Sequence, residues 1–290
     1  TGLLNAAARD WDWELIDRLG YPRRLFGPLT MPGTVVGPLR SDIAAQVGYQ
    51  STVLQTASHD TASAVMAVPA GDADAAWISS GTWSLMGVEN PAPITSEDSR
   101  RLNLTNEGGY DYRYRYLKNI MGLWIVQNIR KELGTERYSF AELSRLAGEA
   151  EDFNAVIDVD DASLLAPTSM IDAVRALCAA SGQPVPETPG QLMRCAYASL
   201  ARCYARTLGE LEQMTGRHFD ALHIVGGGSQ DAYLNALTAK TCGIPVLAGP
   251  TEATAIGNLL SQLIAGGALS GLAEARQLVR RSTELRRFEP

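Results

Sequence analysis

The sequence predicts an α/β fold, and three of its features indicate this class. From residue 155 onward, strand-like and helix-like stretches alternate, which is the pattern of helices layered on a sheet. A glycine triplet (Gly226, Gly227 and Gly228) separates a buried strand candidate from a helix. The chain has 290 residues, of which 46% are hydrophobic, so it is long enough to bury a sizeable core.

The first half of the chain is predicted to hold short elements separated by loops. Gly20 ends the first helix and Pro69 ends the third. Only Gly81 and Thr82 separate two apolar stretches, and so short a connection requires a hairpin. In order, we expect helix 13–19, helix 41–47 capped by Ser41 or Asp42, strand 53–57, helix 60–68, a turn and domain boundary at 70–74, strands 75–80 and 83–88, a loop at 90–104 and strand 112–117.

The second half is predicted to contain longer helices between buried strands. Gly134 and Gly216 stand where two of these helices end, as C-terminal glycines do. In order, we expect helix 119–133, helix 140–150, strand 155–159, helix 170–180, helix 191–215, strand 221–225, helix 230–242, strand 245–248, helix 253–265 and helix 274–281.

The composition bounds the partners and the cellular location. A net charge of −7 argues against a nucleic-acid partner, because such partners require a basic face. No apolar run is long enough to span a membrane, and no signal peptide opens the chain. The four cysteines form no Cys-x-x-Cys pair and no cluster with zinc spacing, so we expect no metal site and buried free thiols in a cytoplasmic protein.

Asp60 is a candidate general base. It follows a short strand and begins a helix, and α/β folds build their sites at such corners. A carboxylate there could accept the proton of a substrate hydroxyl, which raises the rate roughly 10²- to 10⁴-fold. The alternative is that Asp60 only caps the helix, since Asp is a favoured N-cap residue. Its neighbours His59 and Thr61 are either satisfied polar residues or substrate contacts.

Two glycine-containing turns are candidate phosphate sites. Gly81 and Thr82 offer backbone N–H groups and a hydroxyl that could hold phosphate oxygens, and an ordinary hairpin turn is the alternative. The triplet Gly226, Gly227 and Gly228 would let a nucleotide approach the backbone, and a plain left-handed turn is the alternative. Asp231 replaces the third glycine of a dinucleotide fingerprint, which argues against an oxidoreductase.

Two amides flank the strongest predicted helix. Asn119 could be only its cap. Gln127 shares a helix side with Ile120, Leu123 and Trp124, and a polar amide on an apolar face needs a partner. That partner could be backbone, water or a ligand.

Taken singly these signals are weak, but their order along the chain resembles a known family. The motifs are Ser-His-Asp-Thr-Ala-Ser-Ala-Val (58–65), Ile-Ser-Ser-Gly-Thr-Trp-Ser-Leu-Met-Gly-Val-Glu (78–89), Leu-Thr-Asn-Glu-Gly-Gly-Tyr (104–110), Leu-Lys-Asn-Ile-Met-Gly-Leu-Trp (117–124), His-Ile-Val-Gly-Gly-Gly-Ser-Gln (223–230) and Ala-Thr-Ala-Ile-Gly-Asn (253–258). They resemble the rhamnulokinases, a branch of the FGGY carbohydrate kinases, which have the actin-like ATPase (ribonuclease H-like) fold.

The resemblance implies ATP-dependent phosphorylation of L-rhamnulose at its 1-hydroxyl, with Mg²⁺. It implies a role for each candidate residue. Asp60 is the proton acceptor; His59, Asp60, Thr61 and Asn119 contact the sugar; Gly81, Thr82, Gln127, Gly226, Gly227 and Gly228 form the nucleotide site. It also implies a disulfide between Cys178 and Cys195, which a reducing cytoplasm would oppose.

The chain departs from this family in one respect. These kinases open with a first lobe that carries an Asp-x-Gly-Thr-like phosphate loop, and no such loop occurs here. We therefore expect residues 1–72 to be the end of the N-terminal lobe and residues 73–290 to be the C-terminal, nucleotide-binding lobe. On this interpretation Thr1 begins in the middle of a longer product, the missing lobe is a partner, and the 290 residues alone are nearly inactive. The remaining alternatives are a kinase for a related ketose and a non-catalytic sensor on the same fold.

Overall fold

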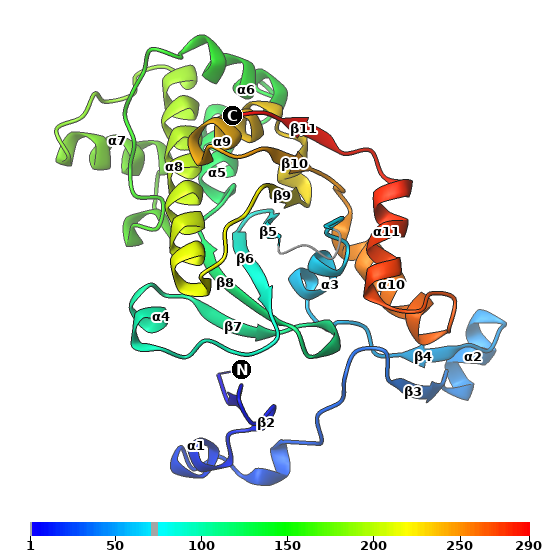
Figure 1. Cartoon of the computed structure of the whole chain (residues 1–290). Coiled ribbons are helices and arrows are strands. Elements are labelled where there is room, and N and C mark those ends of the chain that lie inside the picture. Colours follow the sequence, from blue (N-terminus) through cyan, green and yellow to red (C-terminus); the bar gives the residue numbers. More distant parts are fainter. Residues whose placement is uncertain (1, 71–74) are drawn as a thin grey trace.

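A seven-stranded mixed sheet forms the centre of the computed structural model, which describes residues 2–70 and 75–290 (Figure 1). Its strands are β5 (Ala76–Ser80), β6 (Ser84–Asn90), β7 (Thr105–Gly108), β8 (Tyr114–Ile120), β9 (Leu222–Val225), β10 (Val246–Ala248) and β11 (Arg286–Phe288). The order across the sheet is β11-β10-β9-β5-β6-β8-β7. Strand β9 runs parallel to β5 and β10, and the other neighbours are antiparallel. The predicted α/β class is confirmed.

Helices cover both faces of this sheet (Figure 1). One face packs against α5 (Trp124–Leu133), α6 (Phe140–Glu149), α7 (Met170–Ala180), α8 (Pro189–Thr215) and α9 (Ala232–Cys242). The other packs against α3 (Asp60–Met66), α10 (Ala253–Ala265) and α11 (Leu272–Ser282). Successive strand side chains point to opposite faces, so Ile78 joins the first core and Trp77 joins the second.

Helix α8 is the longest helix of the described chain and runs along one face of the sheet. It begins at Pro189 because Thr188 and Gln191 form a capping box, in which each side chain accepts an N–H at the helix start. It ends at Gly216, whose φ of 66° is easily adopted only by glycine. The predicted helix 191–215 is therefore confirmed and starts two residues earlier.

Residues 2–54 pack loosely and expose apolar side chains. Their elements are β1 (Leu4–Asn5), β2 (Asp10–Trp11), α1 (Trp13–Arg18), β3 (Val35–Pro38), α2 (Ser41–Val47) and β4 (Thr52–Leu54). Ile16 is their one buried hydrophobic side chain, whereas Val35, Val36 and Tyr49 are each more than half exposed. Figure 1 places this segment to one side of the sheet. Helix α2 is confirmed, although Arg40 rather than Ser41 or Asp42 is its N-cap residue.

Several boundaries differ from the predictions because pairing with distant segments decides them. Asn119 does not cap a helix: it lies in β8, which pairs with β6 as far as Ile120, so α5 begins only at Trp124. The loop predicted at 90–104 contains α4 (Glu97–Arg101), which Ser96 caps. The turn and boundary predicted at 70–74 lie almost wholly outside the described residues.

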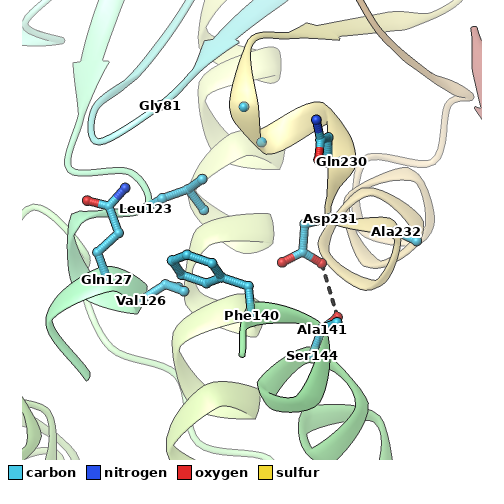
Figure 2. Close-up of a pocket in the computed structure, with 12 residues that line it drawn as sticks. Gly81, Leu123, Val126, Gln127, Phe140, Ala141, Ser144, Gln230, Asp231 and Ala232 are labelled. Carbon is cyan, nitrogen blue, oxygen red and sulfur yellow. Dashed lines mark hydrogen bonds between the residues drawn. The ribbon is translucent and has the colours of Figure 1, made fainter. Parts of the chain in front are cut away.

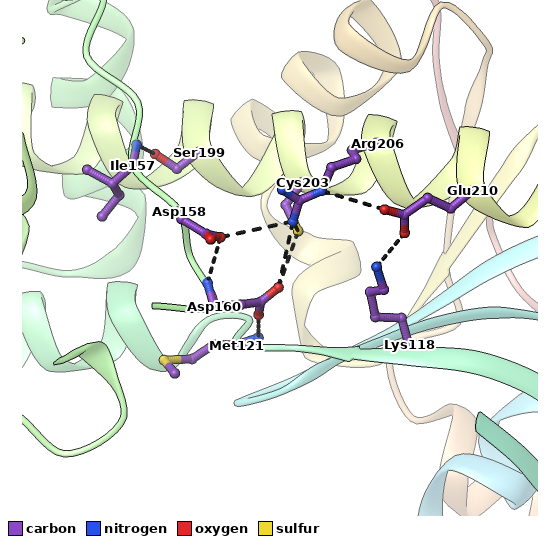
Figure 3. A network of polar contacts seen from close by, with 9 residues as sticks. All are labelled: Lys118, Met121, Ile157, Asp158, Asp160, Ser199, Cys203, Arg206 and Glu210. Carbon is purple, nitrogen blue, oxygen red and sulfur yellow. Dashed lines mark hydrogen bonds and ion pairs between the residues drawn. The ribbon is translucent and has the colours of Figure 1, made fainter. Parts of the chain in front are cut away.

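The strand predicted at 155–159 is instead an irregular segment held along α8 (Figure 3). The N–H of Ile157 donates to Ser199 Oγ at 2.9 Å. Arg206 lies 3.9 Å from Asp160 and from Glu210, and Lys118 of β8 forms an ion pair with Glu210. Asp160 also accepts the N–H of Met121 at 3.0 Å. This network fixes the turn between β8 and α5 to α8.

Cys178 and Cys195 lie close together but are not bonded in the structure. Their Sγ atoms are 3.8 Å apart, whereas a disulfide bond is about 2.05 Å long. Burial raises the pKa of both thiols, which therefore stay protonated at neutral pH. The disulfide implied by the family resemblance stays a prediction.

His223 of β9 makes the stability dependent on pH. Burial, together with Arg276 and Arg280, lowers the pKa of His223 from 6.5 to about 4. Between these values the unfolded chain binds a proton that the folded chain does not, so stability falls as the pH falls. We expect this group to reduce the free energy of unfolding by about 3 kcal/mol between pH 7 and pH 4.

Denaturant unfolding at a series of pH values checks this expectation. His223→Met should remove that part of the pH dependence, and His218→Gln, at a side chain that is 77% exposed, should leave most of it. An unchanged slope in His223→Met would contradict the assignment.

Among the described residues, no helix combines the length and the apolar character needed to cross a bilayer.

Candidate active site

A cavity of about 800 Å³ opens where the carboxyl ends of β5 and β9 lie side by side. Parallel pairing brings the turns that follow these two strands to the same edge of the sheet. The N-terminus of α3 and the end of β8 complete the wall. The lining residues are His59, Asp60, Thr61, Ser79, Ser80, Gly81, Thr82, Trp83, Leu85, Glu107, Asn119, Gly226, Gly227, Thr251, Glu252 and Thr254.

A second cavity of about 520 Å³ adjoins the first and shares Gly81 and Gly227 with it. Leu123, Val126 and Phe140 line much of it with apolar side chains, and polar side chains stand on both sides, Gln127 next to Val126 and Gln230 and Asp231 across the cavity (Figure 2). The other lining residues are Leu123, Val126, Gln127, Phe140, Ala141, Ser144, Gly228, Gln230, Asp231 and Ala232. Such a mixture suits a flat, partly apolar ring with a few hydrogen-bonding atoms.

The glycine triplet separates the two cavities. Gly226 has a φ of 85° and a ψ of −170°, which is a conformation for glycine alone, and its N–H donates to Pro250 O at 3.0 Å. A Cβ atom on Gly228 would stand 1.9 Å from Ser80 Oγ. Apart from its chain neighbours, no atom of the described residues lies within 4 Å of the corresponding position on Gly227. The backbone and its packing therefore require glycine at positions 226 and 228. At Gly227 the space where a side chain would stand is unfilled, on the wall that both cavities share.

Asp60 projects from the first turn of α3 into the larger cavity. His59 is the N-cap residue, so the alternative that Asp60 occupies the N-cap position is wrong. Its Oδ1 still accepts one free N–H of the helix start, that of Thr61, at 2.6 Å. The carboxylate is 75% exposed, so it is available to a ligand.

The turn between β5 and β6 is joined to the start of α5. The N–H groups of Leu123 and Trp124 donate to the carbonyl oxygens of Gly81 and Thr82, at 3.2 and 2.9 Å. The hydroxyl of Thr82 donates to Gln127 Oε1 at 3.3 Å. Gln127 thus has a protein partner and also lines the smaller cavity, while the hairpin predicted at this turn is confirmed.

Buried charge lies behind the carboxylate. The Arg115 side chain of β8 is 4% exposed and lies 3.0 Å from Glu107 Oε2. Burial lowers the pKa of Arg115, and Glu107 and Asp60 oppose this effect. Within the described parts of the chain, no three His, Cys, Asp or Glu side chains are grouped closely enough to hold a metal ion.

A family model matches most of the chain. Residues 76–266 match the C-terminal domain of the FGGY family of carbohydrate kinases. The chain belongs to this family. The matched range includes every strand of the sheet except β11, and both cavities lie largely within it.

Curated relatives of the chain bear the name rhamnulokinase. One from Oceanobacillus iheyensis is 41% identical over 285 residues, which cover 98% of this chain and 60% of that protein. One from Enterococcus faecalis is 44% identical over 297 residues, which cover 100% of this chain and 60% of that protein. The chain thus spans about 60% of the length of these relatives.

Solved structures agree on the fold. A gluconate kinase from Lactobacillus acidophilus superimposes with a TM-score of 0.78 at 16% identity, over 100% of this chain and 58% of that one. A glycerol kinase from Plasmodium falciparum gives a TM-score of 0.72 at 13% identity, over 98% and 56%. The expected actin-like ATPase fold of the FGGY kinases is confirmed.

All the residues predicted to form the sugar and nucleotide sites line one or both cavities, although they come from five segments of the chain, whereas Cys178 and Cys195 line neither. Sequence reasoning missed several other lining residues. Thr254 lies in a motif that carried the family resemblance, so a signal for it existed. Phe140 and Ser144 carried no signal, because only the packing of α6 brings them to the smaller cavity.

Proposed function

We propose that this protein is part of an ATP-dependent kinase that converts L-rhamnulose to L-rhamnulose 1-phosphate. The observation that carries the proposal is the meeting of two cavities at Gly81 and Gly227. One cavity presents the exposed carboxylate of Asp60, and the other is largely apolar. The name of the curated relatives supports this sugar as the acceptor.

In the proposed reaction Asp60 is the general base. The 1-hydroxyl of the sugar loses its proton to this carboxylate as its oxygen bonds to the γ-phosphorus. The bond from that phosphorus to the bridging oxygen breaks, and ADP leaves with the electron pair. The base later releases its proton to solvent. A magnesium ion, if it came in with ATP, would supply positive charge that offsets the charge of the phosphates.

The remaining lining residues are assigned to the two substrates. His59, Thr61 and Asn119 lie with Asp60 in the larger cavity, where they would hold the sugar. Thr82 would contact phosphate at the junction, beside Gly81 and Gly226. Gln127, Gly227 and Gly228 line the smaller cavity, where they would bind the nucleotide. We also propose a cytoplasmic location, because ATP, the proposed phosphoryl donor, is abundant in the cytoplasm.

We further propose that residues 1–72 belong to a first lobe and residues 73–290 to a second. Most of the exposed large hydrophobic side chains lie in residues 2–54, where few apolar atoms are covered. A surface of this kind favours contact with another part of the protein. The missing lobe is the proposed partner, and helix α3 already packs across the proposed boundary onto the sheet.

The test is ADP release with ATP, Mg²⁺ and L-rhamnulose. The complete gene product and the 290-residue chain are assayed side by side, with L-fuculose and L-xylulose as competing acceptors. We expect L-rhamnulose to stimulate turnover by the complete product and to have little effect on the 290 residues, because phosphoryl transfer requires both substrates to be positioned. Binding of sugar and ATP without turnover by the complete product would contradict the proposal and favour a sensor.

A further inference from the structure

The carboxylate of Asp60 has one oxygen surrounded by donors and one oxygen free of them. Oδ1 accepts the N–H of Thr61 at 2.6 Å and the hydroxyl of Thr61 at 3.3 Å. The Nε2 atom of His59 lies 3.4 Å from the same oxygen. Within residues 2–70 and 75–290, no hydrogen bond reaches Oδ2. The two oxygens of this carboxylate are therefore not equivalent.

The other ring nitrogen of His59 faces a group that can only donate. Nη1 of Arg115 lies 3.4 Å from His59 Nδ1. A guanidinium carries five N–H donors, has no acceptor and stays charged in proteins. Three other donors of Arg115 are engaged, one by Glu107 and two by the carbonyl oxygen of Gly108. Nδ1 must therefore be the acceptor of this hydrogen bond.

This contact determines where the neutral imidazole carries its proton. A neutral imidazole has one N–H and one acceptor nitrogen. Since Nδ1 accepts from Arg115, the proton of His59 is on Nε2, and Nε2 faces Asp60 Oδ1. Arg115 thus donates to His59, and the N–H of His59 is on the nitrogen that lies 3.4 Å from Asp60 Oδ1. Such a contact at the second nitrogen is how proteins select a histidine tautomer.

We infer that Arg115 and His59 are positioning residues that hold Oδ1 of Asp60, so that Oδ2 is the oxygen that accepts the proton of the substrate. The inference rests on the proposed function for the role of Asp60, but the tautomer of His59 can be measured without turnover. Arg115 is suited to the task because its side chain is 4% exposed and is held by Glu107, whereas His59 and Asp60 face the cavity. Because the guanidinium of Arg115 is buried and paired, its position should not change when the sugar binds or leaves.

The first experiment is a two-bond ¹H–¹⁵N correlation spectrum of the 290-residue chain at about pH 8.5, where imidazoles are ordinarily neutral. The chain has three histidines, and His59→Gln assigns the signals of His59. We expect the Nε2–H tautomer in the native chain. In the charge-matched variant Arg115→Met with Glu107→Gln, we expect a mixture of tautomers. Arg113→Met, which removes a half-exposed arginine nearby, should leave the signals unchanged.

The second experiment compares two substitutions of His59 in the complete gene product. The amide nitrogen of His59→Gln can occupy the position of Nε2 and still donate to Asp60. In His59→Asn the shorter amide replaces Nδ1, so it can accept from Arg115 but cannot reach Asp60. Both variants lose the imidazole as a sugar contact, so KM should change in both. We expect kcat to stay within about tenfold in His59→Gln and to fall about 100-fold in His59→Asn.

The outcomes separate the two proposals. A native Nδ1–H tautomer, or equal kcat values for the two His59 variants, would overturn the inference even if Asp60 proves essential. If the native chain shows the Nε2–H tautomer but the complete product shows no sugar-stimulated turnover, the proposed function is contradicted and the assigned tautomer is retained. If the double variant fails to fold, the native tautomer and the pair of His59 variants still decide the inference.

Discussion

Replacement of Asp60 by Asn should lower kcat for L-rhamnulose phosphorylation by roughly 10²- to 10⁴-fold, the range expected for loss of a general base. An amide cannot take up the hydroxyl proton. The Oδ1 atom of Asn can still accept the Thr61 N–H that Asp60 accepts at 2.6 Å, so helix α3 should be undisturbed. The side chain is exposed, and the free energy of unfolding should therefore stay within about 0.5 kcal/mol of the native value.

Steady-state kinetics of the complete gene product measure this effect, with sugar binding followed separately. Asp152→Asn is the matched control, because Asp152 is an exposed carboxylate after α6 and lines neither cavity. A kcat within about tenfold of native in Asp60→Asn would remove Asp60 from the chemistry. A normal kcat with a raised KM would leave it only a sugar contact.

Gly257→Ala should destabilise the protein by about 3 kcal/mol, the upper end of the usual cost of overpacking. Gly257 of α10 packs directly against α3, and a Cβ atom there would stand 1.8 Å from Ser63 O and 2.4 Å from Ser63 C. Both atoms belong to the backbone, so no side-chain rotation relieves the clash. The two helices would have to separate, and α3 carries Asp60.

Denaturant unfolding measures the destabilisation. The matched control is Gly209→Ala in α8, where, within the described residues, no atom beyond the helix's own backbone and the adjoining residues lies within 4 Å of the new Cβ. Alanine is the better helix former, so this control should be neutral or up to about 1 kcal/mol more stable. A Gly257→Ala variant as stable as the control would show that the α3–α10 contact yields more easily than its geometry indicates.

The sequence predicted elements well where local signals end them. Helices α7 and α10 have the predicted bounds, and the turn at Gly81 and Thr82 makes the predicted hairpin, although it is one residue longer because β6 begins at Ser84. Elements defined by a distant partner were missed or misplaced. Asn119 belongs to β8 only because β6 pairs with it, and the edge strand β11 exists only against β10.

The candidate site was predictable in its members and not in its geometry. The family motifs carried Asp60, Thr82 and Gly227 in order, and the fold brings these residues to adjoining cavities. The contact of Arg115 with His59 had no sequence signal, because 56 positions separate the two residues and only the packing of α3 beside β8 joins them. A sequence motif identifies a residue type at a position, but it does not indicate which atom of the side chain faces which partner.

Gly81 and Gly227 belong to the walls of both cavities, and this gives the proposed sugar and nucleotide sites a thermodynamic connection. A ligand that shifts either turn changes the shape that the second ligand meets. If bound nucleotide changes the affinity for sugar by some factor, bound sugar must change the affinity for nucleotide by the same factor, because the free energy of coupling is reciprocal. The thin wall of glycine backbone is therefore where the order and the synergy of substrate binding would be determined.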